Sequence, residues 1–302
     1  MDHIKRIILV LSCFLVLCCT ETHHSMTSRP YLSQLTEHSI VISWHTLVAA
    51  PSVVEYGETK TYGLTARVNE RTKFHSVTLT GLKPSTRYHY RILSAKMTKD
   101  YQFRTAVKAG EPFTFVIYGD TQPNDKEHAK ILEKISKMEP LFIINTGDLV
   151  HQDKETDWDD YFSVICEKTD VGETVPIYAT VGNHDGPEHG QDALYYKYLV
   201  LPVNHFYQNE AFYSFNVGNV HFISLNSYLP FDPGSPQYEW LAEDLKASAS
   251  YKWKMVFLHE PPYSTGKHGS NTNEQRILVP LFEKSGVDLV FDPPTAVIPH
   301  RP

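Results

Sequence analysis

The sequence predicts an all-β sandwich followed by an α/β domain in which β-sheets are flanked by helices. Residues 28–107 alternate between apolar and polar side chains in short runs separated by turns, whereas residues 113–291 alternate strand-like with helix-like runs. The 302 residues suffice for about two domains. With 41% hydrophobic and 21% charged residues, the composition is that of an ordinary globular protein.

The first domain is predicted from strands with a clear two-residue periodicity. In the run 39–44, Ile40, Ile42 and Trp44 fall on one face and the intervening residues on the other. Further strands are expected at 52–56, 75–80, 88–93 and 101–104. The aromatic side chains of this block are interpreted as core, not as a stacking platform for sugars or bases; they are Trp44, Tyr56, Tyr88 and Tyr90.

A turn with glycine and proline in suitable places joins two of these strands. The segment 79–90, LTGLKPSTRYHY, resembles the corner of a fibronectin type III domain. In such a corner a tyrosine hydroxyl ties the turn to the backbone. Tyr88 and Tyr90 are both candidates for this part. His75, in the preceding strand, is interpreted as a polar surface residue.

The second domain begins with a strand, a helix and a strand. The run Asp125–Met138 repeats apolar residues at helical spacing, and Asn124 with Glu127 three residues later forms a capping box at its start. The flanking strands 113–118 and 141–145 are therefore expected to be parallel neighbours. A hairpin, two helices and a last strand complete the domain, at 212–226, 237–247, 274–284 and 287–291.

The N-terminus, residues 1–25, is expected to be a secretory signal. A short basic stretch precedes the apolar run Ile7–Leu17, which is too short to span a bilayer. Cys18-Cys19 leaves a lipoprotein signal open, and a lipid anchor there is the only membrane attachment expected. The protein is thus expected to be secreted or in the cell envelope. Cys166 is the only cysteine in the body of the chain, so no internal disulfide is expected after processing.

The charge distribution argues against a nucleic-acid partner. The formal net charge is -7 and the isoelectric point is about 6.1. The sequence contains no lysine- and arginine-rich stretch that could bind a phosphate backbone, so no nucleic acid is expected as a partner.

Four predicted strands end in polar turns that carry metal-binding side chains. The strands 113–118, 141–145, 175–180 and 254–258 are followed by Asp120, Asp148, Asn183 and His259. If these strands lie parallel in one sheet, their carboxyl ends meet at one edge and the side chains converge. Oxygen and nitrogen ligands without a thiolate suit zinc, manganese, iron or magnesium. A shared pair of divalent ions is therefore expected.

The order of these turns resembles one enzyme family. The motifs similar to those of the calcineurin-like metallophosphoesterases are Gly119-Asp120, Gly147-Asp148, Gly182-Asn183-His184-Asp185 and a strand ending in His259. With the sandwich in front, the chain resembles a two-domain purple acid phosphatase. The resemblance implies two divalent metal ions, Fe, Zn or Mn, and hydrolysis of phosphate monoesters by a metal-bound hydroxide. Asp120 would bind the first ion, Asp148 would bridge both, and Asn183 with His259 would bind the second.

The same resemblance assigns residues that face the substrate. His184 and His268 match two histidines that stabilise phosphoryl oxygens or protonate the leaving group. His151 stands where the purple enzymes carry a tyrosine that binds Fe(III), so a colourless site is expected. Gln122 stands where many relatives have a metal-binding histidine. His151 and Gln122 are therefore secondary candidates for metal ligands.

The tail departs from the family pattern. After the strand 287–291 the family continues with Gly-His-x-His, which gives each ion one ligand. This chain continues with residues 292–302, of which four are proline, so neither a helix nor a central strand is expected there. The segment is interpreted as an aberrant Pro-rich tail on a domain that is incomplete at its C-terminus. The second sheet that the resemblance implies after Gly-His-x-His is accordingly expected to be missing.

Three functions are compatible with these features. The first is a metal-dependent phosphatase that acts on a small phosphate monoester. The second, left open by the absent Gly-His-x-His pair, is an inactive fragment whose sandwich serves as a binding or adhesion module. The third is a phosphodiesterase, because the order of domains does not separate monoesters from diesters.

Overall fold

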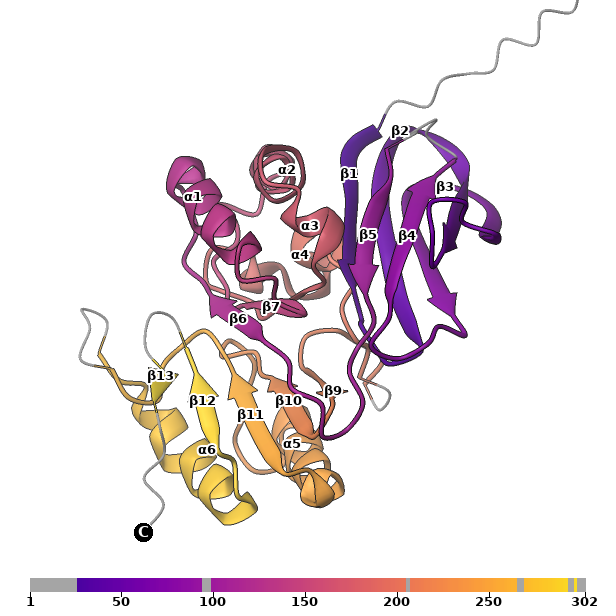
Figure 1. Cartoon of the computed structure of the whole chain (residues 1–302). Coiled ribbons are helices and arrows are strands. Elements are labelled where there is room, and N and C mark those ends of the chain that lie inside the picture. The colour runs from indigo at the N-terminus through magenta and orange to yellow at the C-terminus, as the bar shows by residue number, and fades with distance from the viewer. Residues whose placement is uncertain (1–25, 94–98, 205–206, 265–268, 293–295, 298–302) are drawn as a thin grey trace, which may run out of the picture.

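A computed structural model describes the chain over residues 26–93, 99–204, 207–264, 269–292 and 296–297 (Figure 1). The expected signal, the candidate His268 and most of the Pro-rich tail lie outside these residues. An all-β domain stands beside an α/β domain, which confirms the predicted fold class. No helix in this part combines the length and apolar character needed to cross a bilayer.

Two long strands, β2 and β3, run through both halves of the sandwich. Its strands are β1 Met26–Ser33, β2 Ser39–Gly57, β3 Leu64–Thr80, β4 Arg87–Ile92 and β5 Tyr101–Arg104. The first half of β2 pairs with β1 and with the end of β3. Its second half pairs with the start of β3 and with β4, which in turn pairs with β5. Register shifts between His45 and Ser52 separate the halves, so the strands predicted at 39–44 and 52–56 are one interrupted strand.

Three of the four aromatic side chains predicted as core are buried in the sandwich: Trp44, Tyr88 and Tyr90 are each at most 4% exposed. Tyr56, the fourth, is half-buried and packs against this core. The Tyr88 hydroxyl accepts a hydrogen bond from the backbone N–H of Lys83 at 3.0 Å, so Tyr88 ties the turn after β3. The Tyr90 hydroxyl instead donates to the backbone carbonyl of Glu173 in the second domain at 2.8 Å. One of the two candidates therefore holds the corner and the other holds the domains together.

His75 is buried, so the prediction of a surface residue was wrong. It is 1% exposed, and its ring stacks on that of Trp44, its cross-strand partner, at a centroid distance of 4.7 Å. Its Nδ1 and Nε2 atoms each lie 2.8 Å from a hydroxyl oxygen, of Ser52 and Thr46 respectively. A polar ring is tolerated in a core when both nitrogens have partners, as they do here.

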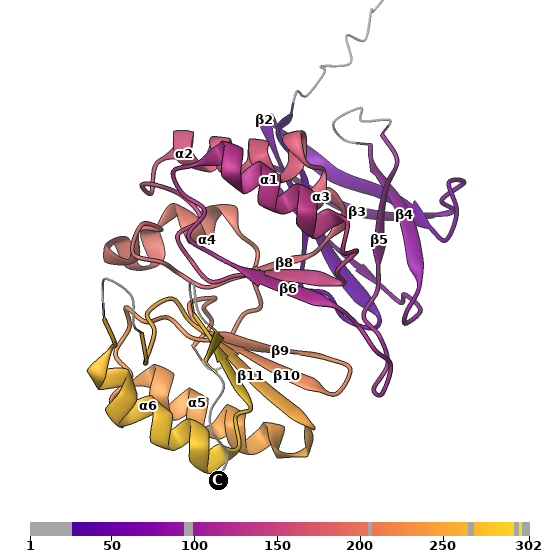
Figure 2. The same ribbon diagram turned by 60° about the vertical axis from the view of Figure 1, so that its left-hand side comes forward.

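The α/β domain consists of two stacked sheets between two layers of helices (Figure 2). The first sheet contains three parallel strands, β6 Phe115–Tyr118, β7 Phe142–Asn145 and β8 Ile177–Ala179. The second sheet has the order β13-β12-β11-β10-β9. Its strands are β9 Tyr213–Val217, β10 Val220–Ser224, β11 Trp253–Phe257, β12 Leu289–Phe291 and β13 Ala296–Val297.

The second sheet corrects one expectation. Its strand β11, the predicted strand 254–258, lies parallel to β10 and β12 and not in one sheet with β6, β7 and β8. The predicted hairpin at Gly218-Asn219 is confirmed by the antiparallel pairing of β9 with β10. β13 is a two-residue edge strand, in agreement with the expectation that the tail forms no central strand.

Helices cover the outer faces of both sheets (Figure 2). They are α1 Asp125–Ser136, α2 Glu155–Phe162, α3 Val171–Thr174 and α4 Leu194–Tyr198 on the first sheet, and α5 Pro236–Ala247 and α6 Thr272–Ser285 on the second. The predicted cap of α1 is confirmed, because the backbone N–H of Glu127 donates to Asn124 Oδ1 at 3.3 Å. Such a cap satisfies a helix N–H that has no partner within the helix.

Aromatic rings join the two sheets. Phe142 of β7 packs against Phe215 and Phe222 of the second sheet at centroid distances of 5.6 and 5.3 Å. Tyr178 of β8 stacks flat on Phe215 at 3.6 Å. These rings bury large apolar areas, which stabilise the stack and hold the two sheets in a fixed relation. The turns at the ends of both sheets are thereby fixed as well.

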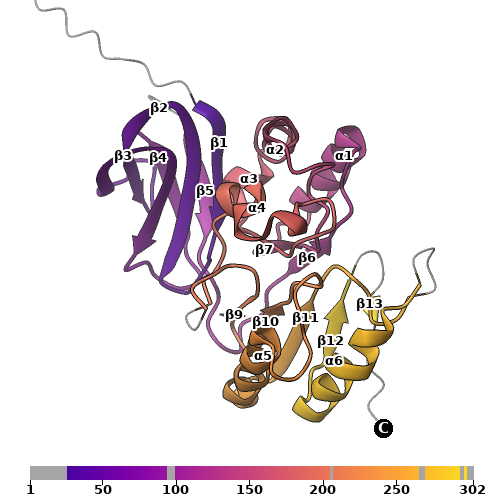
Figure 3. The ribbon, with the colours of Figure 1, turned by 180° about the vertical axis from the view of Figure 1, so that it is seen from behind.

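The sandwich packs against the helical face of the first sheet, with β1 beside α3 and α4 (Figure 3). The Tyr31 hydroxyl donates to the backbone carbonyl of Tyr198 at 2.5 Å. Lys99 Nζ lies 2.9 Å from Asp170 Oδ1 and 2.8 Å from Glu173 Oε2. Hydrogen bonds and ion pairs thus connect the two domains around a shared apolar core.

Candidate metal centre

Three predicted ligands meet although their strands belong to different sheets. Asp120 follows β6, Asp148 follows β7 and His259 follows β11, and one ligand atom from each lies within 4.8 Å of the others. His259 Nε2 is 3.6 Å from Asp148 Oδ1 and 3.2 Å from the side-chain oxygen of Asn183. Asn183 is therefore also part of the cluster. Carboxylate, amide and imidazole ligands suit a divalent ion, so these four residues fit the expected metal.

His259 presents a nitrogen lone pair to this cluster. Its Nδ1 lies 2.8 Å from the backbone carbonyl of Thr146, and a carbonyl can only accept, so Nδ1 carries the hydrogen. The neutral ring then has a free lone pair on Nε2, the atom that faces Asp148 and Asn183. A second hydrogen bond of this kind is the usual way to orient a metal-binding histidine. The ring is 8% exposed, so its orientation is fixed by packing too.

Glycines allow the turns to approach one another. Gly147 has φ +101°, and a Cβ there would lie 2.6 Å from His259 Nδ1. A Cβ on Gly182 would lie 2.2 Å from both the backbone nitrogen and Oδ1 of Asp148. Contacts this short are sterically forbidden, so any side chain at these positions would push the ligands apart. This close approach is the physical reason for the glycine in Gly147-Asp148 and in Gly182–Asp185.

The two aspartates stand in an unusual backbone conformation. Asp120 has φ +51° and Asp148 has φ +56°, in the left-handed region that non-glycine residues rarely adopt. Backbone hydrogen bonds hold the turns in place: Asp120 N–H donates to Gly147 O at 3.1 Å, and Thr121 N–H to Asp148 O at 3.2 Å. Strained backbone of this kind concentrates at functional sites, where neighbouring structure sustains it.

Asp185 holds two of the metal-binding turns together through backbone hydrogen bonds. It is fully buried, and its Oδ2 accepts hydrogen bonds from the backbone N–H groups of Asp148 and Gly182 at 2.9 and 2.8 Å. Its Oδ1 accepts from the N–H groups of Leu149 and Val150 at 2.9 and 3.2 Å. Burial raises the pKa of this carboxyl, and the amide donors oppose that rise. Asp185 thus joins the Asp148 turn to the Asn183 turn, a role that the sequence analysis did not assign.

His184 lies on the other side of Asp148. Its backbone N–H donates to Asp148 Oδ1 at 3.0 Å, and its Nε2 is 4.0 Å from Asp148 Oδ2. Its Nδ1 donates to the backbone carbonyl of His151 at 2.7 Å, so Nε2 is the nitrogen free to face a ligand. The ring of His184 also stacks on that of His151 at 5.5 Å. His184 therefore lies at the cluster, as expected of a residue that faces the substrate.

Gln122 and His151, the secondary ligand candidates, bind each other. His151 Nδ1 lies 2.8 Å from Gln122 Oε1, and Gln122 Nε2 lies 3.4 Å from Asp148 Oδ2. Gln122 thus supports Asp148 through a hydrogen bond and leaves its own oxygen to His151. Both residues line a cavity of about 210 Å³ beside the cluster. The remaining candidate, His268, lies outside the described residues.

Comparison with known proteins agrees with this geometry. Residues 113–291 match the calcineurin-like phosphoesterase family, and residues 28–105 match the purple acid phosphatase N-terminal domain. "Purple acid phosphatase 21" of Arabidopsis thaliana is 30% identical over 229 residues, which are 72% of this chain and 51% of that protein. "Phosphoenolpyruvate phosphatase" of Allium cepa is 27% identical over 282 residues, 84% of this chain and 58% of that protein. The chain spans about half the length of the curated relatives it matches.

Solved structures share the arrangement of both domains. A purple acid phosphatase from yellow lupin (Lupinus luteus) seeds, PPD1, superposes with a TM-score of 0.70 at 19% identity, covering 89% of this chain and 58% of that one. PhoD superposes with a TM-score of 0.65 at 15% identity, covering 90% and 71%. At these identities the likeness concerns the fold. Together with the motif turns and the match over residues 113–291, it identifies the chain as a member of the calcineurin-like phosphoesterase family, preceded by a purple acid phosphatase N-terminal domain.

Proposed function

We propose that this chain is a metal-dependent phosphatase that hydrolyses small phosphate monoesters and uses two divalent ions. The observation that carries the proposal is the convergence of Asp120, Asp148 and His259 from three strand ends of two sheets. Asn183 adds an amide oxygen to the same cluster. These carboxylate, amide and imidazole groups gather behind glycines that leave no room for a side chain, as a bound metal ion requires.

The two oxygens of Asp148 face different sides, which supports a bridging role. Oδ1 lies toward His259 Nε2 and accepts from the backbone N–H of His184, and Oδ2 lies toward the side-chain nitrogens of Gln122 and His184. One carboxylate can thus serve one ion on each side. When bound, such an ion pair offsets the charge of a phosphate ester and activates a water molecule for attack. Asp120 and Asn183 would complete the ligand sets on the two sides.

His184 is proposed to protonate the leaving group or to donate a hydrogen bond to a phosphoryl oxygen. Because Nδ1–H is engaged by the His151 carbonyl, the nitrogen that gains or loses a proton is Nε2, which faces the cluster. In the protonated ring, Nε2–H can donate to a phosphoryl oxygen or transfer its proton to the departing alkoxide. The fixed ring orientation supplies the position that such a transfer needs.

A second proposal, an inactive chain that binds metal weakly or not at all, rests on the residues after β12. These are Asp292-Pro293-Pro294, whereas the resemblance led us to expect Gly-His-x-His. Each ion would then lack one imidazole, and the sandwich would be the functional part as a binding module. A phosphodiesterase is the third proposal, and it differs from the first only in the preferred ester.

One set of measurements separates these proposals. The purified chain is stripped of metal, reloaded with Mn²⁺, Zn²⁺ or Fe²⁺, and assayed for metal content and for hydrolysis of p-nitrophenyl phosphate and bis-p-nitrophenyl phosphate. A phosphatase binds metal, favours the monoester and loses both properties in Asp148→Asn. The control Glu133→Gln removes one charge from an exposed position of α1 and is expected to behave as wild type. Folded protein that hydrolyses neither ester, with little or no metal bound, supports the binding module, and preference for the diester supports the phosphodiesterase.

A further inference from the structure

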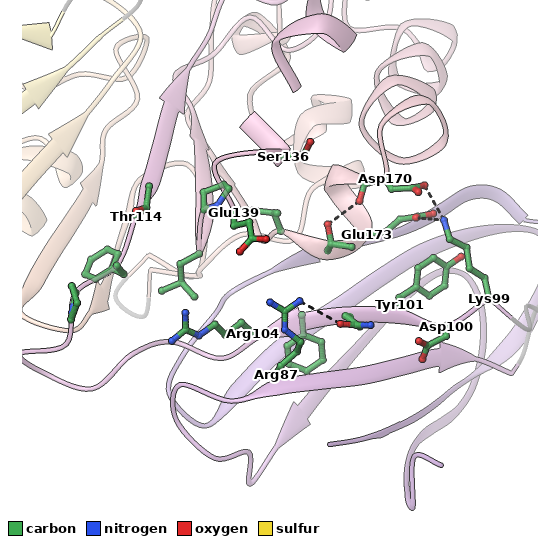
Figure 4. Close-up of a pocket in the computed structure, with 18 residues that line it drawn as sticks. Arg87, Lys99, Asp100, Tyr101, Arg104, Thr114, Ser136, Glu139, Asp170 and Glu173 are labelled. Carbon is green, nitrogen blue, oxygen red and sulfur yellow. Dashed lines mark hydrogen bonds and ion pairs between the residues drawn. The ribbon is translucent and has the colours of Figure 1, made fainter. Parts of the chain in front are cut away.

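A cavity of about 690 Å³ lies between the sandwich and the first sheet of the α/β domain (Figure 4). One wall is formed by β4 and β5. The opposite wall is formed by the residues that precede β6, β7 and β8, such as Thr114 before β6 and Leu141 before β7. Cavities of this size commonly hold small molecules.

Two arginines stand side by side on the sandwich wall. Arg87 of β4 and Arg104 of β5 are directly opposite in the antiparallel pairing. The next residues, Tyr88 and Phe103, point into the sandwich core and are 4% and 2% exposed, so both arginines point outward. Figure 4 shows both side chains on the side of this ribbon that faces Glu139. Like charges directly opposite one another destabilise a sheet, which makes this pairing unfavourable in the absence of an anion.

Neither guanidinium has a carboxylate partner among the described residues. Arg87 Nη1 makes a long hydrogen bond of 3.4 Å to Gln102, and no described carboxylate lies within 4.0 Å of either arginine. Glu139, which also lines the cavity, stays beyond that distance. Glu111, the other acidic residue near Arg104, is bound to the Ser85 hydroxyl.

The acidic groups at the far end of the cavity are already paired. Asp170 and Glu173 lie 2.9 and 2.8 Å from Lys99 Nζ, and Asp100 lies 3.7 Å from Lys60 Nζ. The cavity is therefore electrostatically divided. One end holds ion pairs, and the other holds two guanidinium groups that have no carboxylate partner among the described residues, against the single carboxylate of Glu139.

We propose that Arg87 and Arg104 form a binding site for a small oxyanion, a phosphate or a carboxylate, that bridges the two guanidinium groups. Each guanidinium presents a planar fork of donors that matches two oxygens of such an anion. Thr114 lines the same cavity and its hydroxyl can donate to a further oxygen, while Leu141 offers an apolar surface to the body of an organic anion.

This site is separate from the metal centre. Thr114 precedes β6 and Asp120 follows it, and Leu141 precedes β7 and Asp148 follows it. The cavity thus lies at the amino ends of the parallel strands and the metal ligands at their carboxyl ends. Binding at one site leaves the ligands of the other untouched, so the two can be tested independently.

The test is calorimetric titration of the metal-free full chain with inorganic phosphate and, separately, with succinate. Saturable binding of either anion is expected, and the anion that binds identifies the preferred chemistry. Arg87→Gln and Arg104→Gln should each weaken binding about tenfold or more, since each removes a charge-assisted fork. Thermal melting verifies that each variant is folded.

Two controls make the proposal refutable. Arg67→Gln removes the same charge from an exposed position of β3 and should leave the affinity unchanged, as should Asp148→Asn at the metal centre. The proposal is overturned if neither anion binds, if Arg67→Gln weakens binding as much as Arg104→Gln, or if Asp148→Asn abolishes it.

Discussion

Replacing Asp185 by asparagine tests whether a buried carboxylate holds the metal-binding turns together. Its two oxygens each accept two backbone hydrogen bonds, four in all. An amide group keeps one of these oxygens and replaces the other by NH₂, a donor. Asp185→Asn therefore loses two hydrogen bonds and leaves two buried N–H groups facing another donor.

The magnitude follows from those two bonds. A hydrogen bond to a charged acceptor contributes about 1.5–3 kcal/mol, so two of them amount to about 3–6 kcal/mol. Small domains are stable by only about 5–15 kcal/mol, so the change should be plain in equilibrium unfolding. Because Oδ2 links the backbone of Asp148 to that of Gly182, the substitution should also loosen the cluster and weaken metal binding.

The assay is urea unfolding followed by circular dichroism, with metal titration of the folded variant. The midpoint should shift to lower urea while the slope stays the same, as expected for a change in stability alone. Asp232→Asn, at an exposed loop position, serves as the matched control and should unfold as wild type does. If Asp185→Asn unfolds at the wild-type midpoint and binds metal equally well, the proposed role of this carboxylate is wrong.

Three further predictions concern packing and pH. Gly182→Ala should abolish metal uptake, measured by titration, because its Cβ would collide with Asp148 at 2.2 Å; normal uptake would contradict the close approach. Burial raises the pKa of Glu274 from 4.5 to about 8, so its contribution to stability is present at pH 4 and lost as the pH rises toward 8. The urea midpoint of the wild type should therefore decline over this pH range, and Glu274→Gln should flatten the decline. Parallel pH profiles of the two midpoints would refute this role of Glu274. Burial lowers the pKa of His45 from 6.5 to about 4, so stability should fall by on the order of 3 kcal/mol as the pH drops through that window. His45→Phe should remove most of this acid lability, and an unchanged acid profile would count against burial as its cause.

Local patterns in the sequence were sufficient for most of the individual elements. The hairpin at Gly218-Asn219 was predicted by its turn residues, and the cap at Asn124 by its spacing to Glu127, because both depend on neighbours in the chain. The convergence of the metal ligands was predicted from strand ends alone. That reasoning could not tell which sheet a strand joins, so β11 was assigned to the wrong one while His259 was still expected near Asp148.

The features that sequence reasoning missed depend on distant pairings. His75 is buried because β3 pairs it with Trp44 and brings two hydroxyls to its ring, and nothing near it in the chain indicates this. Asp185 was visible within the Gly182–Asp185 motif, but its role became clear only when four backbone amides were found around it. The arginine pair depends on the register between β4 and β5, which spacing alone does not fix.

Anomalous X-ray scattering from crystals of the chain grown with Mn²⁺ would test the central claim most directly. We predict metal density coordinated by Asp120, Asp148, Asn183 and His259, and its loss in Asp148→Asn. Crystals of well-folded protein without metal at these residues, or with metal bound elsewhere, would contradict it.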